Sequence, residues 1–213
     1  MSNRSKRILM SVLGVVLAGV SVGFLKRAAF GVDPFQTFMS GLDALLPISF
    51  GTLYVIASLV LLTFSLISDR HYIGLATFVT LFFQGYVIDF SREILFSAFP
   101  VMQSGGRFLF LMIGIVLLCL ASSVYFTADL GVSTYDAVSL IIANTWKVGK
   151  FKYNRIICDL VCVCFGSGMY LISGGEINGL TAIVGAGTII TAFFMGPLIE
   201  FFNERVARPL LNS

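Results

Sequence analysis

The chain has 213 residues, of which 57% are hydrophobic and 12% charged, and its formal net charge is +3. Its mean hydropathy of +0.95 lies outside the range of soluble globular proteins, so we predict one integral membrane domain over 1–213 with no aqueous domain. Lys and Arg stand at the ends of apolar runs and form no basic block interleaved with aromatic residues, which argues against nucleic-acid binding.

Six apolar segments are long enough to cross a bilayer, whose hydrocarbon core of roughly 30 Å needs about 20 helical residues. They are Ile8–Leu25, Gly51–Ile67, Ile73–Ile88, Phe108–Thr127, Ile156–Ile172 and Ala182–Phe202. The first follows a basic stretch, as a signal peptide does. It exceeds the usual apolar length of about 7–15 residues and lacks a small-x-small cleavage site, so we predict a retained helix.

Two shorter segments, Pro34–Leu46 and Thr134–Trp146, follow the first and fourth spans. Both are too short to cross independently, and both begin with polar residues. Asp33 and Asp43 make the first of them a poor spanning helix. We predict two half-helices that dip into the membrane and are buried by the neighbouring spans.

The two halves of the chain share short motifs. Gly31–Gln36 recurs as Gly131–Asp136, and the segment 74–90 recurs, with the same Gly-x-x-Thr start and a closing acid, as 185–201. Such duplication is typical of secondary transporters. We predict internal repeats over 8–93 and 108–204.

The predicted fold class is an all-α membrane protein of six transmembrane helices in two three-helix repeats. Three spans per repeat would invert the second repeat relative to the first, so the half-helices would enter from opposite faces. The alternative has eight spans in two parallel repeats. The Lys/Arg distribution predicts cytoplasmic termini in both models, because only Arg70, Arg92 and Arg107 change sides.

The repeated glycine motif precedes residues that favour a helix start. Asp33 stands before Pro34, and Ser133 before Thr134. Two helix N-termini inside the membrane would offer free N–H groups and positive dipole ends to an anion or a carboxylate, as in many transporter sites. In the alternative interpretation, Asp33 and Ser133 only cap their helices at the membrane interface.

Ionisable residues within the membrane are costly and therefore mark further candidates. Asp136 takes the place of Gln36 in the second motif, and Arg155 and Asp159 are spaced to pair on one helix face. Arg155 would bind an anionic solute or, alternatively, extend to the interface. The polar residues Thr77, Gln84, Tyr86 and Thr188 are predicted to line a path. The predicted solute-binding residues are Gly31, Asp33, Gln36, Gly131, Ser133, Thr134, Tyr135, Asp136, Arg155 and Asp159.

No enzyme motif is present, and we predict no catalytic activity, cofactor or metal. The chain has one histidine, His71, and four cysteines without a CxxC pair, which we expect to pack as small apolar residues.

The segment Gly31–Phe35, its counterpart Gly131–Asp136, the Phe50-Gly51-Thr52 entry to the second span and the two Gly-x-x-Thr segments resemble the bacterial YczE/YyaS/YitT family of multi-pass membrane proteins. The resemblance covers nearly the whole chain. Thr134 stands where the family's second copy usually has proline, which implies a less rigid helix start. The resemblance implies an inner-membrane location and names no substrate.

These observations predict a secondary transporter or facilitator of a small anionic or zwitterionic solute in the bacterial cytoplasmic membrane. The expected partners are the lipid bilayer and the solute, and a homodimer stays open. The alternative is a non-transporting membrane partner of another complex, and a passive channel comes third.

Overall fold

The structure is a computed structural model that describes residues 3–212, all of whose regular elements are helical. The elements are α1 (Asn3–Ala28), α2 (Pro34–Leu45), α3 (Phe50–Ser68), η1 (Arg70–Tyr72), α4 (Leu75–Val79), η2 (Thr80–Gln84), α5 (Gly85–Ala98), α6 (Ser104–Ala128), α7 (Thr134–Leu140), η3 (Ile141–Thr145), α8 (Phe151–Ile172), α9 (Ile177–Ile183), α10 (Ala186–Phe202), η4 (Asn203–Ala207) and α11 (Arg208–Asn212). Turn η1 is a 3₁₀-helix, and η2, η3 and η4 are π-helical turns.

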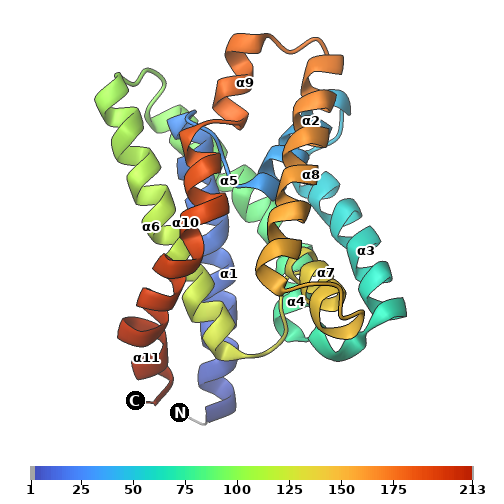
Figure 1. Ribbon diagram of the computed structural model, residues 1–213. Coiled ribbons are helices and arrows are strands. Elements are labelled where there is room, and N and C mark those ends of the chain that lie inside the picture. Colours follow the sequence, from blue (N-terminus) through green and yellow to red (C-terminus); the bar gives the residue numbers. More distant parts are fainter. Residues whose placement is uncertain (1–2, 213) are drawn as a thin grey trace.

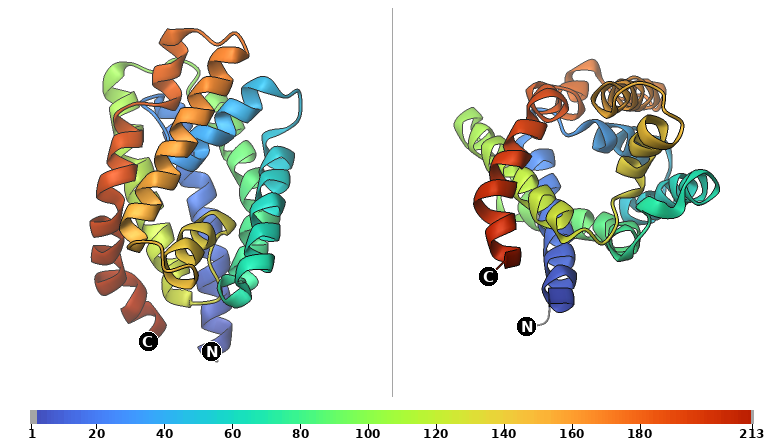
Figure 2. Two further views of the ribbon diagram at one scale, coloured as in Figure 1. Left: turned by 45° about the vertical axis from the view of Figure 1, so that its right-hand side comes forward. Right: turned by 60° about the horizontal axis from the view of Figure 1, so that its bottom comes forward.

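The long helices form an elongated bundle with both termini at one end, which we call the terminal end (Figure 1). Helix α2 lies toward the opposite end, whereas α4 and α7 lie toward the terminal end, as a second orientation also shows (Figure 2). The two short helices that follow α1 and α6 therefore lie toward opposite ends of the bundle.

Five helical stretches are long and apolar enough to cross a membrane, namely 4–28, 50–68, 104–128, 153–172 and 179–212. They match five of the six predicted spans. Large apolar side chains such as Val60, Phe165 and Phe193 are more than half exposed on these helices, as expected for contact with lipid. The chain is therefore a multi-pass membrane protein.

The remaining predicted span, Ile73–Ile88, is helical from Leu75 to Ala98 but contains the π-helical turn η2. The stretch 179–212 contains the last predicted span, Ala182–Phe202, but its helix is interrupted at Val184 and Gly185, between α9 and α10. A new helix thus begins after Gly185 in the second half of the chain, as one begins after Gly74 in the first half.

Helices α1 and α6 pack against each other along their length, and the start of each helix contacts the end of the other in the same way. Arg7 Nη1 donates to the Ala128 carbonyl at the end of α6 at 3.0 Å, and Arg107 Nε donates to the Ala28 carbonyl at the end of α1 at 2.8 Å. A cationic side chain at a helix C-terminus satisfies its free carbonyls and its dipole. Each helix therefore supplies the cap of the other.

Two glycines lie in the same α1–α6 contact. Gly14 of α1 packs against Tyr125 of α6, and Gly114 of α6 packs against Leu25 of α1, with no space for a Cβ atom at either glycine. Small residues let helix backbones approach closely in a membrane, where lipid removes the hydrophobic drive for association. These contacts hold the two long helices together in an antiparallel pair.

The loops before the two short helices are held by the opposite half of the chain. Val32 N–H donates to the Ile183 carbonyl at 3.1 Å, and Val132 N–H donates to the Tyr72 carbonyl at 3.1 Å. The loop before α2 thus docks at the start of α10, and the loop before α7 docks at the start of α4. These hydrogen bonds fix where each short helix begins.

Glycine is required in both loops for two reasons. Gly31 and Gly131 have φ values of +94° and +97°, a region that side chains other than glycine rarely adopt. A Cβ atom at Gly31 would also overlap the backbone of Gly185, and one at Gly131 would overlap that of Gly74. The repeated glycine therefore serves the loop docking.

Thr77 and Thr188 take part in the same docking sites. The Thr77 hydroxyl accepts from Gly74 N–H at 3.0 Å and donates to the Val132 carbonyl at 2.6 Å, while the Thr188 hydroxyl accepts from Gly185 N–H at 3.2 Å. Both side chains are buried. The expectation that they line a polar path is wrong, because they cap the helices that begin after Gly74 and after Gly185.

Candidate functional site

A cavity of about 690 Å³ lies within the bundle and is lined by residues of α1, α2, α3, α6, α7, α8 and α10. Its volume falls in the range of roughly 300–1,000 Å³ that is usual for small-molecule sites. The starts of both short helices border it, over residues 33–36 and 133–136. The cavity is therefore the place where the two repeated motifs meet.

Each motif begins its helix with a side-chain cap. Asp33 has an extended backbone, and its Oδ1 accepts from Gln36 N–H at 3.2 Å, while Pro34 occupies the first helical position. Ser133 does the same for the second helix, because its hydroxyl accepts from Asp136 N–H at 3.1 Å. The capping predicted from sequence is confirmed at both helices.

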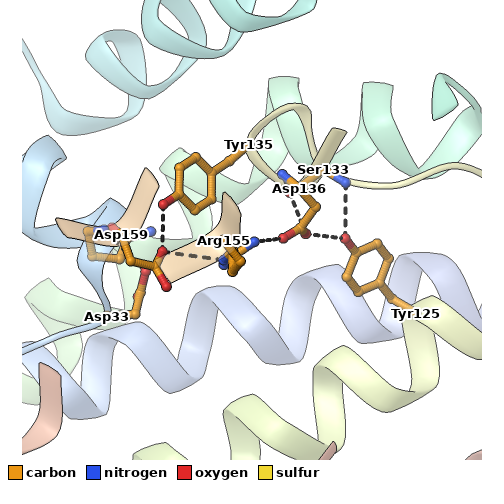
Figure 3. A network of polar contacts seen from close by, with 8 residues as sticks. Asp33, Tyr125, Ser133, Tyr135, Asp136, Arg155 and Asp159 are labelled. Atoms are coloured by element: carbon orange, nitrogen blue, oxygen red, sulfur yellow. Dashed lines mark hydrogen bonds and ion pairs between the residues drawn. The ribbon is translucent and has the colours of Figure 1, made fainter. Parts of the chain in front are cut away.

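Arg155 of α8 occupies the centre of a polar network in this cavity (Figure 3). Its Nη1 contacts Asp136 Oδ1, and its Nε lies 3.3 Å from Asp159 Oδ1. The guanidinium carbon also lies 4.5 Å from the centre of the Tyr135 ring, a cation–π distance. The predicted Arg155–Asp159 pair is confirmed, and Asp136 is a second partner that the helix spacing did not predict.

Two tyrosine hydroxyls complete the network. Tyr135 donates to Asp159 Oδ1 at 2.6 Å. Tyr125 donates to Asp136 Oδ2 at 2.9 Å and accepts from Ser133 N–H at 3.0 Å. Each of these carboxylates is thus held by Arg155 and one tyrosine, which lowers the cost of placing it inside the protein. Sequence reasoning missed Tyr125, since it stands in an apolar run with no local signal.

Eight of the ten predicted site residues line the cavity: Asp33, Gln36, Ser133, Thr134, Tyr135, Asp136, Arg155 and Asp159. Gly31 and Gly131 instead pack against Gly185 and Gly74. Of the residues expected to line a polar path, Gln84 is on the cavity wall, while Tyr86 is 51% exposed on the helix surface.

This part of the cavity wall has more acidic than basic groups, since it carries three carboxylates, those of Asp33, Asp136 and Asp159, and one guanidinium, that of Arg155. Apolar and aromatic side chains form most of the remaining wall. Within residues 3–212, no three His, Cys, Asp or Glu side chains lie together as a metal site would need. The arrangement is suited to holding a small polar solute through hydrogen bonds and charge.

The chain matches the model of a family described as "Family of unknown function (DUF6198)" over residues 5–204. It is 22% identical to the uncharacterized protein YyaS of Bacillus subtilis (strain 168) over 94% of both chains. It is 26% identical to the uncharacterized membrane protein YczE of the same organism, over 88% of this chain and 80% of YczE.

A third relative, an uncharacterized protein of Haemophilus influenzae, is 22% identical over 95% of this chain and 86% of its own length. No solved structure matches the chain. The resemblance to YczE and YyaS predicted from the motifs is therefore confirmed, and the chain belongs to the DUF6198 family of unknown function.

Proposed function

We propose that the protein is a secondary transporter or facilitator of a small solute across the bacterial cytoplasmic membrane, with both termini cytoplasmic. The observation that carries the proposal is the cavity of about 690 Å³ bordered by the starts of α2 and α7. Interrupted helices that begin at one shared site are a recurrent construction in secondary transporters. The polar network around Arg155 supplies the oriented hydrogen-bonding groups that such a site needs.

The proposal includes two inverted repeats, 8–93 and 108–204, with six spans. A two-fold axis in the membrane plane would require each contact between the repeats to occur twice. The paired caps of Arg7 and Arg107, and the paired loop hydrogen bonds of Val32 and Val132, support this relation. The positions of α2 and α7 toward opposite ends of the bundle support it as well (Figures 1 and 2).

The eight-span alternative would require α2 to cross the bilayer. Its 12 residues extend about 18 Å, at roughly 1.5 Å per residue, which is well short of the roughly 30 Å hydrocarbon core. Helix α7 with η3 covers 134–145, a stretch of the same length. The six-span arrangement therefore accommodates the short helices better.

The charges of the site support a zwitterionic solute over a purely anionic one. Arg155 is already in contact with Asp136 and Asp159, so an anion would have to displace a carboxylate that a tyrosine also holds. A zwitterion brings its own positive group to the acidic wall. Its negative group can then share Arg155 at a smaller cost.

The test is solute uptake by liposomes that contain the purified protein. Zwitterions, carboxylates and amines are first screened for a shift in the unfolding temperature, and those that stabilise the protein are then followed into the liposomes. Tyr135→Phe removes the hydrogen bond to Asp159 and should lower the rate of uptake. Tyr86→Phe makes the same chemical change on the helix surface and should leave uptake unchanged.

Three results would contradict parts of the proposal. Equal uptake by the two variants would remove the assigned site. Flux that does not saturate with solute concentration would indicate a channel. Absence of any stabilising solute, together with one stoichiometric co-purifying protein, would favour the non-transporting partner.

A further inference from the structure

Asp33 differs from the other two aspartates of the cavity in that no described Lys or Arg side chain lies within ion-pair distance of its carboxylate, although Arg155 and Lys26 act on it from farther away. Asp136 and Asp159 each contact Arg155 and accept from a tyrosine hydroxyl. Among the side chains that the structure describes, no Lys or Arg forms an ion pair with Asp33, whose carboxylate accepts from Gln36 N–H as the helix cap. Figure 3 shows Asp33 at the Asp159 end of the network, with no line to Arg155. A charge in a membrane interior normally has a partner.

Gln36, in the first turn of the same helix, presents a second unmatched acceptor. Its side chain is 2% exposed and lines the cavity, and its carbonyl oxygen Oε1 has no hydrogen-bond donor among the described residues. Buried acceptors without a donor are rare, because leaving one unpaired is costly. Both Asp33 and Gln36 would therefore be stabilised by a group that donates hydrogen bonds or carries positive charge.

The helix dipole does not reverse this preference. The N-terminus of a helix carries about half a positive charge. The Asp33 carboxylate at that N-terminus carries a full negative charge, so the start of α2 remains net negative. The corresponding cap of α7 is the neutral Ser133, and its acid, Asp136, is held by Arg155. The two repeats thus present different charges to the cavity.

The aromatic wall beside Asp33 fits an organic cation as well as an inorganic one. The rings of Phe35 and Tyr135 stack with centroids 4.7 Å apart, and Tyr54 meets Phe35 edge-on at 5.6 Å. Aromatic faces attract ammonium groups. A cation at the start of α2 would have a carboxylate and an amide oxygen within the first turn of the helix, beside this aromatic wall.

We propose that Asp33 and Gln36 form a binding site for a monovalent cationic group, either the ammonium of the solute or an inorganic coupling ion. We call it the cation site. This inference rests on the proposed function in taking the cavity as the solute site. The cation site belongs to the first repeat alone, because the equivalent positions of the second repeat are Ser133 and Asp136, and Asp136 is paired with Arg155.

The test measures binding of Na⁺, K⁺ and methylammonium to the purified full-length protein, by unfolding temperature and calorimetry. N-methyl-D-glucamine chloride keeps the ionic strength constant. Asp33→Ser reproduces the cap of the second repeat, and Asp33→Asn keeps an equally good cap, so α2 should still form in both. Asp129→Asn is the control, because this carboxylate is 89% exposed at the terminal end.

At least one cation should stabilise the wild type saturably. Both Asp33 variants should bind it roughly ten- to a hundredfold more weakly, the range for losing a hydrogen bond to a charged group, and Asp129→Asn should bind it normally. A response to Na⁺ or K⁺ alone would indicate a coupling ion, and one to methylammonium alone the ammonium of the solute. No saturable response, or unchanged affinity in both Asp33 variants, would overturn the inference.

The two proposals fail separately. Solute uptake that needs no cation and persists in Asp33→Ser would contradict the cation site and still support the transporter. Cation binding that depends on Asp33, in a protein that moves no solute, would support the cation site and contradict the transporter.

Discussion

Replacing Tyr125 with phenylalanine should destabilise the protein by releasing the start of α7 from α6. The hydroxyl donates to Asp136 Oδ2 at 2.9 Å and accepts from Ser133 N–H at 3.0 Å, so it joins the helix cap to its acid. Phenylalanine keeps the buried ring and its contact with Gly14. The change therefore removes two hydrogen bonds and little else.

The expected loss follows from these two bonds. A hydrogen bond to a charged group contributes about 1.5–3 kcal/mol, and an N–H left without an acceptor costs about 1–3 kcal/mol when it stays dry. The cavity beside Ser133 can admit water to that N–H, which reduces the second contribution. We expect the free energy of unfolding to fall by about 2–4 kcal/mol.

Unfolding by sodium dodecyl sulfate in mixed micelles measures this difference. Tyr54→Phe is the matched control, because Tyr54 is also a buried cavity residue, and its hydroxyl makes no hydrogen bond to another described residue. It should change the unfolding free energy by less than about 0.5 kcal/mol. If Tyr125→Phe destabilises the protein no more than Tyr54→Phe does, the hydroxyl does not hold α7 and the network is wrongly drawn.

Two further predictions concern the loops. Gly131→Ala should destabilise the protein by about 1–3 kcal/mol or more, because its φ of +97° is strained for alanine and a Cβ atom meets the backbone of α4's cap. Gly168→Ala, in open space on α8, should be neutral or stabilising in the same unfolding assay, and equal effects would contradict the docking. The Thr145 hydroxyl and an N–H of η1 hold the pKa of Asp69 below its ordinary value of 3.8. The stability that Asp69 contributes is therefore present above that value and lost as pH falls through the lowered pKa. Asp69→Asn should reduce the loss of unfolding temperature between pH 5 and pH 3, and an unchanged acid slope would contradict the pairing.

Local signals in the sequence predicted the short helices well. The predicted segments Pro34–Leu46 and Thr134–Trp146 agree with the helical stretches 34–45 and 134–145 to within one residue. Asp33 and Ser133 are strong helix caps, and such a cap works through the next three residues alone. Information of this kind does not depend on tertiary structure.

Tertiary contacts decided what the sequence did not predict. Thr77 was expected on a polar path, but its hydroxyl bonds the Val132 carbonyl, which arrives from the other half of the chain. Tyr125 joins the site because the end of α6 passes beside α7. The break at Gly185 was missed, although the matching Gly74 and Thr77 offered a signal, because an apolar run conceals a helix boundary.

Arg155 shows both cases in one residue. Its pair with Asp159 follows from helix spacing, since residues four apart share a helix face. Its contact with Asp136 requires α8 to lie against the start of α7, which no local pattern specifies. The sequence identified the charged groups of the site, and packing determined how they are paired.

The opposed entry of α2 and α7 is the central claim, and the sidedness of the loop between α2 and α3 tests it most directly. In a cysteine-free background, Pro47→Cys and Val101→Cys place one thiol each at exposed positions of the α2–α3 and α5–α6 loops. Val148→Cys, after η3, is cytoplasmic in both the six-span and the eight-span models and serves as the reference. Labelling intact cells with an impermeant maleimide should modify Pro47→Cys and Val101→Cys and leave Val148→Cys unmodified until the cells are opened. Protection of all three thiols in intact cells would place α2 across the membrane, and the inverted arrangement would be wrong.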